Sequence, residues 1–496
     1  MTDRIHKSMG NGDQCMGKNT QQTNVPLFQR ATGRWEGLCR AIWRALREPH
    51  RVRYTSGEHR SHNDMADWLG SLQNTLRSRQ WQGPLTPIEI EAVQKDLLTL
   101  QRGLTGNRDL VGRSYMQERA LLGSYLLFYW FISRAQVEGM LNMVEARKAW
   151  ENEATSGNIL KTVPSEPIRI LDVGAGPAPG SIAVADWLRS RGSDTPIHIT
   201  ACDRSSEAVE IGAFLAQQAG YTYQGVPLWK AGEDPLPQGQ YDVVFLGHVL
   251  NELWPDREDR IDRRFAFLMG VLSLLRGGGL LIILEPATMT SSREALALRD
   301  RLLTIDTLEI WAPCFYTASC PALTGSNQTC HSHFRSFLPS TTRLLAQRLG
   351  LNKDLIKTTA FVFQKKELLL DDGKDLFPDT VTAIKKGATR KEATQIPDPG
   401  APPLPTTTKD PTLLGPFRVV SEPMLNKAGR TRFILCGPSG RVAFSAKRGE
   451  GYPAEKPFFS LDRSDSILIV NPMQRDQGLA LGAETKILNI AKDSIA

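Results

Sequence analysis

The sequence lacks any hydrophobic run of membrane-spanning length. Its longest apolar stretch, ALLGSYLLFYWFI at residues 120–132, is shorter than the roughly 20 residues that a bilayer-spanning helix needs. We expect this stretch to form a buried helix. The first residues, MTDRIHKSMGNGDQCMGKNTQQ, have no apolar core of the kind that a secretory signal requires. We therefore predict a cytoplasmic protein without a membrane partner.

Cysteine is scarce, and no sign of charge dominates. The chain has 7 cysteines in 496 residues, which excludes the small disulfide-rich proteins and favours a reducing compartment. Hydrophobic residues make up 41% and charged residues 23%, and the formal net charge is +7. This mild basic excess favours a polyanionic partner such as nucleic acid. The length exceeds one ordinary core, so we expect two or three folded units.

The composition changes along the chain and predicts these units. Polar residues 1–27 are expected to be disordered. Residues 28–160 have helical periodicity and predict a helical domain, including a basic amphipathic helix in RWEGLCRAIWRAL, residues 34–46. The Pro-rich stretch 371–412 predicts a linker. Short alternating runs in residues 413–496 then predict a small β domain.

Residues 161–370 have the pattern of an α/β sheet. Short apolar runs separated by helical stretches predict buried parallel strands, and a further run predicts a late strand of the same sheet. These runs are 168–174, 197–203, 241–247, 279–286 and, as the late strand, 358–368. Repeated strand–helix–strand units indicate a doubly wound, Rossmann-like fold.

A glycine-rich turn follows the first of these strands and opens a helix. The segment LDVGAGPAPGS places Gly174, Gly176 and Gly180 directly after Asp172, and glycine lets the backbone bend and approach a ligand closely. Asp203 ends the next strand, where a carboxylate can accept both ribose hydroxyls of a nucleoside. Pro179 stands where a dinucleotide-binding turn has its third glycine. This looser turn favours S-adenosylmethionine over NAD.

The segment after the fourth strand usually carries the catalytic residues in this architecture. Here it reads FLGHVLNELWPD and offers His248, Asn251 and Glu252. It has neither the (Asp/Asn)-Pro-Pro-aromatic motif of amine methyltransferases nor the Pro-Cys nucleophile of cytosine-C5 enzymes. His248 has a side chain that titrates near neutrality and could act as a base. The alternative is a histidine whose hydrogen bonds are satisfied at the end of a strand.

Three cysteines, Cys314, Cys320 and Cys330, fall in one predicted insert, residues 311–340. Three thiolates leave a four-coordinate metal site one ligand short. His331 and His333 are local candidates for the fourth ligand, and Cys436 in FILCGPSG is a distant one. With Cys436, the metal would connect the small β domain to the α/β sheet. Zinc and an iron–sulfur cluster both suit four thiolates, and the spacing does not choose between them.

Several segments together resemble one protein family. LDVGAGPAPGS, GHVLNELW, IILEPAT, APCFYTASCP with CHSHF, and FILCGPSGRVAFSAKR occur in this order between about residues 110 and 460. The order is similar to that in mitochondrial ribosomal small-subunit protein 22, methyltransferase-like protein seventeen and their bacterial relatives. The resemblance implies a Rossmann-like methyltransferase domain that binds S-adenosylmethionine, and a location in the cytoplasm of a bacterium or in mitochondria of a eukaryote.

The resemblance also implies site residues and a partner. It assigns a [4Fe–4S] cluster to Cys314, Cys320, Cys330 and Cys436, and the cofactor turn to Asp172, Gly174, Gly176, Gly180 and Asp203. It implies association with the small ribosomal subunit and its RNA, through rRNA methylation or subunit assembly. The sequence does not give the oligomeric state, and we expect a monomer. Two alternatives remain open: a catalytically silent assembly factor, and a small-molecule methyltransferase with a structural zinc.

Overall fold

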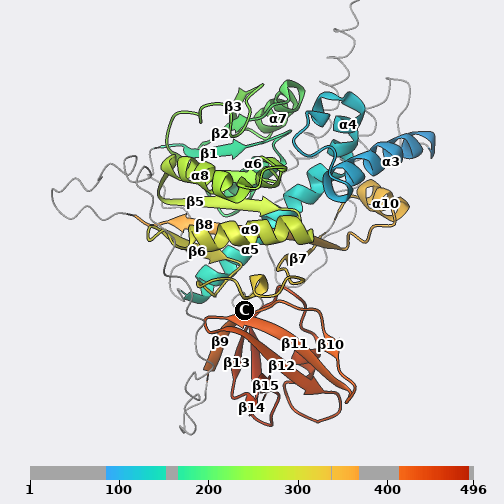
Figure 1. Cartoon of the computed structure of the whole chain (residues 1–496), viewed down its shortest axis with the longest axis vertical. Helices are drawn as coiled ribbons and strands as arrows, with labels where there is room; N and C mark the ends of the chain where they lie inside the picture. The colour runs from blue at the N-terminus through green and yellow to red at the C-terminus, as the bar shows by residue number, and fades with distance from the viewer. Residues whose placement is uncertain are drawn as a thin grey trace, which may run out of the picture.

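The computed structural model describes residues 85, 87–151, 166–336, 338–367, 413–476 and 478–490. The predicted disordered segment 1–27, the predicted basic helix at 34–46 and the predicted linker 371–412 lie outside these residues. No helix in the described part of the chain is long and apolar enough to cross a membrane. Figure 1 shows two sheets stacked end to end, with helices around the larger one.

The larger sheet has the strand order β3-β2-β1-β4-β5-β8-β6, with β7 paired to β8. β1 to β5 are parallel, whereas β8 is antiparallel to β5, and β6 and β7 are antiparallel to β8. This order is that of Rossmann-like methyltransferases, so the predicted fold class is confirmed. The strands are β1 (Ile168–Val173), β2 (Ile197–Cys202), β3 (Thr222–Val226), β4 (Tyr241–Gly247), β5 (Leu275–Glu285), β6 (Leu308–Ala312), β7 (Ser332–Arg335) and β8 (Leu355–Lys365).

The sheet has a hydrophobic core on each face because successive side chains of a strand point to opposite sides. In β1, Ile170 packs into one core and Leu171 into the other. The first core lies under α6 (Pro179–Ser190), α7 (Ser206–Gln218) and α10 (Ser340–Arg348), and the second lies under α8 (Arg260–Ser273) and α9 (Met289–Leu302).

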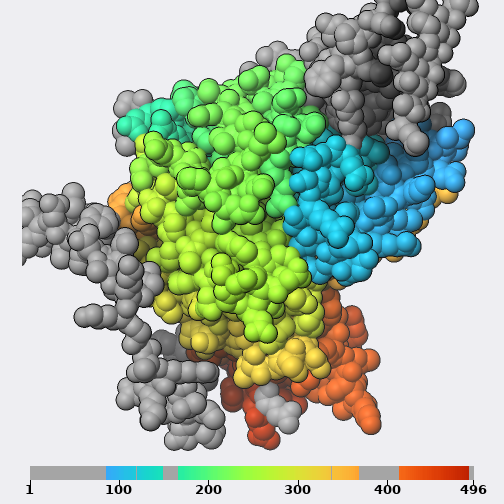
Figure 2. Space-filling model, turned by 45° about the horizontal axis from the view of Figure 1, so that its top comes forward, coloured from blue at the N-terminus to red at the C-terminus, as the bar shows by residue number. Residues whose placement is uncertain are grey.

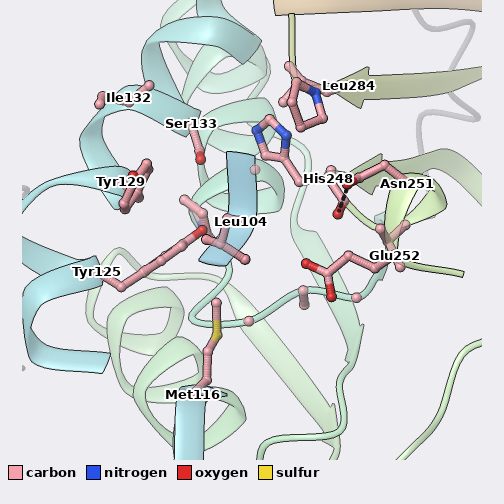
Figure 3. Close-up of a pocket in the computed structure, with 18 of the residues that line it drawn as sticks. Leu104, Met116, Tyr125, Tyr129, Ile132, Ser133, His248, Asn251, Glu252 and Leu284 are labelled. Atoms are coloured by element: carbon pink, nitrogen blue, oxygen red, sulfur yellow. Dashed lines mark hydrogen bonds between the residues drawn. The ribbon is translucent and has the colours of Figure 1, made fainter. Parts of the chain in front are cut away.

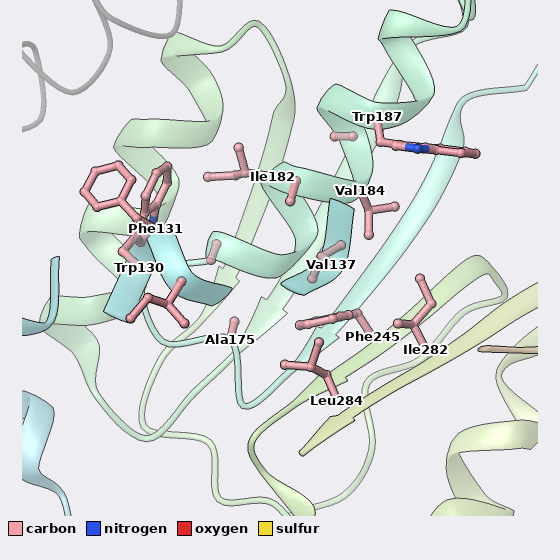
Figure 4. Close-up of a cluster of buried hydrophobic side chains, with 14 of the residues drawn as sticks. Trp130, Phe131, Val137, Ala175, Ile182, Val184, Trp187, Phe245, Ile282 and Leu284 are labelled. Carbon is pink, nitrogen blue, oxygen red and sulfur yellow. The ribbon is translucent and has the colours of Figure 1, made fainter. Parts of the chain in front are cut away.

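Helices from the N-terminal part of the chain add a layer over the first core. These are α3 (Pro87–Gln101), α4 (Arg119–Leu127) and α5 (Tyr129–Glu151), with short turns at Arg102–Gly106 and Tyr115–Gln117. The apolar run 120–132 is divided between α4 and α5 and is mostly buried. Figure 4 shows Trp130, Phe131 and Val137 of α5 in one cluster with Ile182 and Val184 of α6. The indole N–H of Trp130 donates to the carbonyl of Pro177 at 3.2 Å, so α5 contacts the glycine-rich turn directly.

The second sheet is formed by the C-terminal part of the chain and has its own core. Its order is β14-β15-β12-β11-β9-β13-β16, with β10 on β11. Phe433, Phe444 and Phe458 pack edge to face at its centre. The elements are β9 (Leu413–Val419), β10 (Met424–Leu425), β11 (Arg430–Gly437), β12 (Gly440–Lys447), α11 (Glu455–Phe459), β13 (Ser466–Val470), β14 (Met473–Arg475), β15 (Gly478–Ala480) and β16 (Lys486–Asn489). In Figure 2 the yellow segment that contains the cysteine insert lies between this orange domain and the larger sheet.

Candidate cofactor pocket and cysteine cluster

The glycine-rich turn connects β1 to α6 and forms one wall of a cavity of about 410 Å³. Gly174 and Gly176 have φ angles of +70° and +51°, a left-handed region that glycine enters without steric cost. A Cβ on Gly180 would come 2.0 Å from Cε1 of Phe245. This third glycine therefore allows α6 to pack closely on β4. All three glycines line the cavity.

Of the two aspartates at this turn, Asp203 lines the cavity and Asp172 does not. Asp172 is 1% exposed, and its Oδ2 accepts hydrogen bonds from the Ser181 hydroxyl at 2.5 Å and the Ser181 amide at 3.2 Å. Burial raises the pKa of Asp172 to about 7, although both bonds from Ser181 oppose the shift. Asp172 thus fixes the start of α6 behind the turn and is not among the residues that line the cavity.

Asp203 faces the cavity at the end of β2. Its Oδ2 accepts from the amide of Gly176 and its Oδ1 accepts from the amide of Ser205, each at 2.8 Å. Burial raises the pKa of Asp203, and these backbone bonds oppose the shift. Each carboxylate oxygen can accept more than one hydrogen bond. The fixed carboxylate therefore keeps acceptor capacity for a ligand with hydroxyl groups.

The segment after β4 is held by a buried carboxylate of β5. Glu285 accepts hydrogen bonds from the amides of Leu250 and Asn251, at 3.0 and 3.3 Å. His248 has a positive φ of 60°, and its amide donates to the carbonyl of Leu284 at 2.6 Å. A non-glycine residue in this conformation costs free energy and persists only when its surroundings determine it. The hydrogen bonds to Glu285 and Leu284 hold His248 in this conformation.

The structure brings the three predicted catalytic residues to one wall of the cavity (Figure 3). Asn251 is buried, and its side-chain amide donates to the carbonyl of His248 at 2.8 Å, so it shapes the segment. Burial raises the pKa of Glu252 to about 7, and its Oε2 accepts from the amide of Gly112 at 3.4 Å. Burial lowers the pKa of His248 to about 4, so its imidazole is neutral near pH 7.

The opposite wall comes from residues that the sequence pattern does not assign to the site. Met116, Tyr125 and Tyr129 belong to the N-terminal helices and face the cavity (Figure 3). The two tyrosine rings have centroids 5.7 Å apart. Tyr125 and Tyr129 lie in a continuous apolar run of the sequence. Such a run predicts that they are buried but not that they line a cavity. Lys353 and Lys357, before and in β8, also line the cavity, and only the tertiary fold brings them there.

The four predicted metal ligands gather where the two sheets meet. Cys314 follows β6, Cys320 precedes a short turn at Pro321–Leu323, Cys330 precedes β7, and Cys436 lies in β11. All four are free thiols of intermediate exposure. Burial, with smaller contributions from the nearby Cys314 and Cys330, raises the pKa values of Cys320 and Cys436 to about 12. Cys436 is therefore close enough to Cys314 and Cys330, across the domain boundary, for their charges to interact.

The thiols do not by themselves form a ready metal site. Among the described residues, no group of three or more histidine, cysteine, aspartate or glutamate side chains is arranged to hold a metal ion. His331 and His333, the alternative local ligands, pair with each other, with their Nε2 atoms 2.9 Å apart. The residue types nevertheless suit a thiolate-bound metal or cluster, and Arg299 and Arg418 place positive charge near Cys314.

Arginines order the segment that carries these cysteines. Arg299 of α9 is 1% exposed and donates to the carbonyls of Ala318, at 2.6 Å, and Tyr316. Arg293, earlier in the same helix, donates to the carbonyls of Gly325 and Gln328, both at 2.7 Å. Because this segment has little regular structure of its own, its backbone acceptors depend on these side chains.

Arg418 of β9 makes the corresponding contact from the C-terminal domain. Its guanidinium donates to the sulfur of Cys330 at 3.4 Å, to the carbonyl of His331 at 2.9 Å and to the hydroxyl of Ser332 at 2.8 Å. Arg418 is 2% exposed. Because Arg418 also lies opposite Cys436 in the pairing of β9 with β11, this side chain connects the C-terminal domain to the segment that carries Cys330.

Comparison with known families gives a match in the centre of the chain. A family model described as mitochondrial small ribosomal subunit Rsm22 matches residues 158–354, which confirms the family resemblance over this range. No curated protein matches the chain.

Several solved structures are similar in part. NSun6 from Pyrococcus horikoshii with SFG is 17% identical over 46% of this chain and 52% of that chain, with a TM-score of 0.28. This chain thus matches about half the length of that protein. A putative class I S-adenosylmethionine-dependent methyltransferase from Listeria monocytogenes is 11% identical over 69% and 91% of the two chains, with a TM-score of 0.28. Loganic acid methyltransferase with SAH is 10% identical over 50% and 97%, with a TM-score of 0.32. The fold assignment rests on the strand order described above.

Proposed function

We propose that the chain binds S-adenosylmethionine in this cavity and acts on the small ribosomal subunit as a methyltransferase of its RNA. The observation that carries the proposal is the pairing of Asp203 with Gly176 across the glycine-rich turn, at 2.8 Å. This pairing fixes a carboxylate beside a backbone that a ligand can approach closely. The family match to a mitochondrial small-subunit protein supports the ribosome as partner, in the bacterial cytoplasm or in mitochondria.

The residues of the cavity have distinct roles in this proposal. Asp203 accepts the ribose hydroxyls, and Gly174, Gly176 and Gly180 leave room for the rest of the cofactor, which supplies an electrophilic methyl group. Asp172 holds the turn from behind. His248 and Glu252 face the acceptor side, and Asn251 positions His248 through its carbonyl.

Two lysines support an anionic acceptor such as RNA. Lys353 and Lys357 line the same cavity. Burial lowers the pKa of Lys353, and the positive charge of Lys357 lowers it further. Neither lysine has a carboxylate within ion-pair distance among the described residues, so a phosphate group would relieve their mutual repulsion. The net charge of +7 favours the same class of partner.

Calorimetry with S-adenosylmethionine tests the cofactor site. Asp203→Ala removes a charged hydrogen-bond acceptor worth about 1.5–3 kcal/mol, so the dissociation constant should rise roughly 10- to 150-fold. Asp262→Ala, which removes a carboxylate 70% exposed on α8, is the matched control and should bind like the unaltered chain. Equal affinity of the Asp203 variant would contradict the ribose assignment.

Methyl transfer to RNA tests the activity itself. Purified protein, labelled S-adenosylmethionine and immature small-subunit particles should yield label in the RNA. The second candidate, a catalytically silent assembly factor, is favoured by the low pKa of about 4 for His248 and by the internal hydrogen bonds of Asn251. Cofactor binding and particle binding without transfer would support that candidate and reject the enzyme.

We further propose that Cys314, Cys320, Cys330 and Cys436 hold a [4Fe–4S] cluster, with a structural zinc as the alternative. Thiolates are the usual ligands of both, and a cluster there would join the two domains covalently through metal–sulfur bonds. The contact of Arg418 with the sulfur of Cys330 at 3.4 Å, and its place opposite Cys436 in the pairing of β9 with β11, support this assignment. Anaerobic purification followed by iron, sulfide and zinc analysis decides between the two. Zinc without iron would keep the connection between domains but favour the small-molecule methyltransferase as the third candidate.

A further inference from the structure

The acceptor side of the cavity contains a short chain of hydrogen bonds that fixes the state of His248. Gln136 of α5 is 4% exposed, and its Nε2 donates to the backbone carbonyl of Lys357 at 2.9 Å. A carbonyl oxygen can only accept, so this bond determines which end of the Gln136 amide is the NH₂ group. The other end, Oε1, lies 3.1 Å from Nε2 of His248.

The orientation of Gln136 determines the histidine tautomer. An amide oxygen only accepts hydrogen bonds, so the 3.1 Å contact requires that Nε2 of His248 carries the hydrogen. A neutral imidazole has a single N–H. Its Nδ1 is then unprotonated and offers a lone pair. Nδ1 has no hydrogen-bond partner among the described residues.

The charged surroundings are consistent with a neutral ring. Burial alone lowers the pKa of His248 to about 4. Glu252 from the same segment, Asp203 and Arg204 from the end of β2, and Lys353 and Lys357 beside β8 line the same cavity. None of them contributes to the shift. The charge of the His248 ring therefore depends on burial, and its tautomer depends on the contact with Gln136.

The backbone of His248 is held in place by several hydrogen bonds. The amide of His248 donates to Leu284 and its carbonyl accepts from Asn251, in a segment that Glu285 holds from β5. His248 lies at the cavity wall across from Ser133 and Tyr129 (Figure 3). A molecule that enters the cavity on this side therefore meets a histidine whose backbone is fixed and whose Nε2 contacts Gln136.

We propose that Gln136 is a positioning residue that holds His248 as the Nε2–H tautomer, so that Nδ1 presents a hydrogen-bond acceptor to the methyl acceptor. The statement that the cavity receives the methyl acceptor rests on the proposed function. The tautomer of His248 does not depend on it. The inference deepens that function by naming the acceptor class: a group that carries a hydrogen on nitrogen or oxygen, such as an amine. A deprotonated thiolate or a bare ring nitrogen has no hydrogen to donate and would face the lone pair of Nδ1 unfavourably.

The test is nuclear magnetic resonance of the full chain labelled with ¹⁵N-histidine, without cofactor or RNA. The chain has 8 histidines, and His248→Gln identifies the signals of His248 by their loss. Long-range ¹H–¹⁵N correlation should give the Nε2–H tautomer, unchanged between pH 6 and 8 in the series of spectra. A His248 ring that is Nδ1–H, or charged at pH 7, would overturn the proposal.

Two variants of Gln136 separate positioning from packing. Gln136→Met keeps the size but removes the acceptor, and a mixture of tautomers should appear. Gln136→Glu restores an acceptor with a negative charge, so it should restore Nε2–H and raise the pKa of His248. A pure Nε2–H tautomer in folded Gln136→Met would overturn the role of Gln136. The measurement on the unaltered chain still decides the tautomer if this variant does not fold. Failure of cofactor binding by calorimetry would refute the proposed function while leaving the tautomer result intact.

Discussion

The cofactor pocket and the cysteine cluster are organised by opposite means. In the pocket, buried carboxylates accept from backbone amides of their own loop or of the loop next to a neighbouring strand, as Asp203 does from Ser205 and Gly176. In the cysteine cluster, buried arginines donate to backbone carbonyls, as Arg418 of the C-terminal domain does to His331 across the boundary. These carboxylates therefore act within one sheet, and the N-terminal helices supply the opposite wall of the pocket. The cluster requires two domains to be docked, so changes there should alter domain association, whereas changes in the pocket should alter ligand binding.

The largest effect is expected from loss of the thiol that the C-terminal domain supplies. Cys436→Ser replaces one of four proposed ligands by a poor one, so most of the bound iron should be lost, together with the connection between the domains. Iron and sulfide analysis after anaerobic purification measures the first effect, and limited proteolysis between the two sheets measures the second. Cys202→Ala, which removes a fully buried thiol of β2, should retain its iron. Full iron content in the Cys436 variant would remove this residue from the ligand set.

A smaller but still large effect is expected from the buried arginine at the same boundary. Arg418→Met leaves the carbonyl of His331 and the hydroxyl of Ser332 without their buried donor. A buried acceptor that loses its donor costs about 1–3 kcal/mol. The free energy of unfolding, measured in urea on the protein with its metal removed, should fall by about that amount. An unchanged value would mean that the two domains dock without this side chain.

The sequence predicts the pocket better than it predicts the cluster, for the same physical reason. A strand followed by a glycine turn is a local pattern, so Gly174, Gly176 and Asp203 can be assigned from the residues alone. The same pattern includes Asp172, yet this residue holds the turn on the side away from the cavity. The pattern does not show this, because a side chain in a strand can point to either face of the sheet. The strands β3, β6 and β7 escape prediction, since their runs are short and partly polar.

The residues that the sequence does not reveal share one property: their role depends on contacts between distant segments. Tyr125 and Gln136 lie in helices whose periodicity indicates burial but not the partner that they meet. Arg299 looks like any exposed arginine of a polar helix, and only the tertiary fold shows that it is 1% exposed. The match between Cys436 and the other three cysteines comes from the family resemblance, because no spacing rule relates residues more than a hundred positions apart.

The pocket should respond to pH through Asp172. Burial raises its pKa from 3.8 to about 7, so the folded protein holds this proton more tightly than the unfolded chain does. The stabilisation is complete below pH 4 and is lost as pH rises toward 7. Relative to Asp172→Asn, the free energy of unfolding of the unaltered chain should therefore fall between pH 4 and 7, by about 1–4 kcal/mol. Urea unfolding at several pH values without cofactor measures this difference. A parallel pH dependence in both proteins would mean that Asp172 is ionised in the fold.

The smallest effect is expected from an exposed ion pair that crosses the same boundary as Arg418. Arg335 of β7 donates to Asp462 of the C-terminal domain at 2.8 Å, but the two side chains are 75% and 59% exposed. Exposed pairs contribute between about 0 and 1 kcal/mol because water and salt screen the charges. Arg335→Ala should therefore change the free energy of unfolding by less than about 1 kcal/mol, and added salt should remove the difference. Both arginines span the two domains, so the contrast with Arg418→Met isolates burial as the cause. If Arg335→Ala destabilises the chain as much as Arg418→Met, the domains are held by charge attraction at their rim, and the buried arginine is not what orders the cysteine cluster.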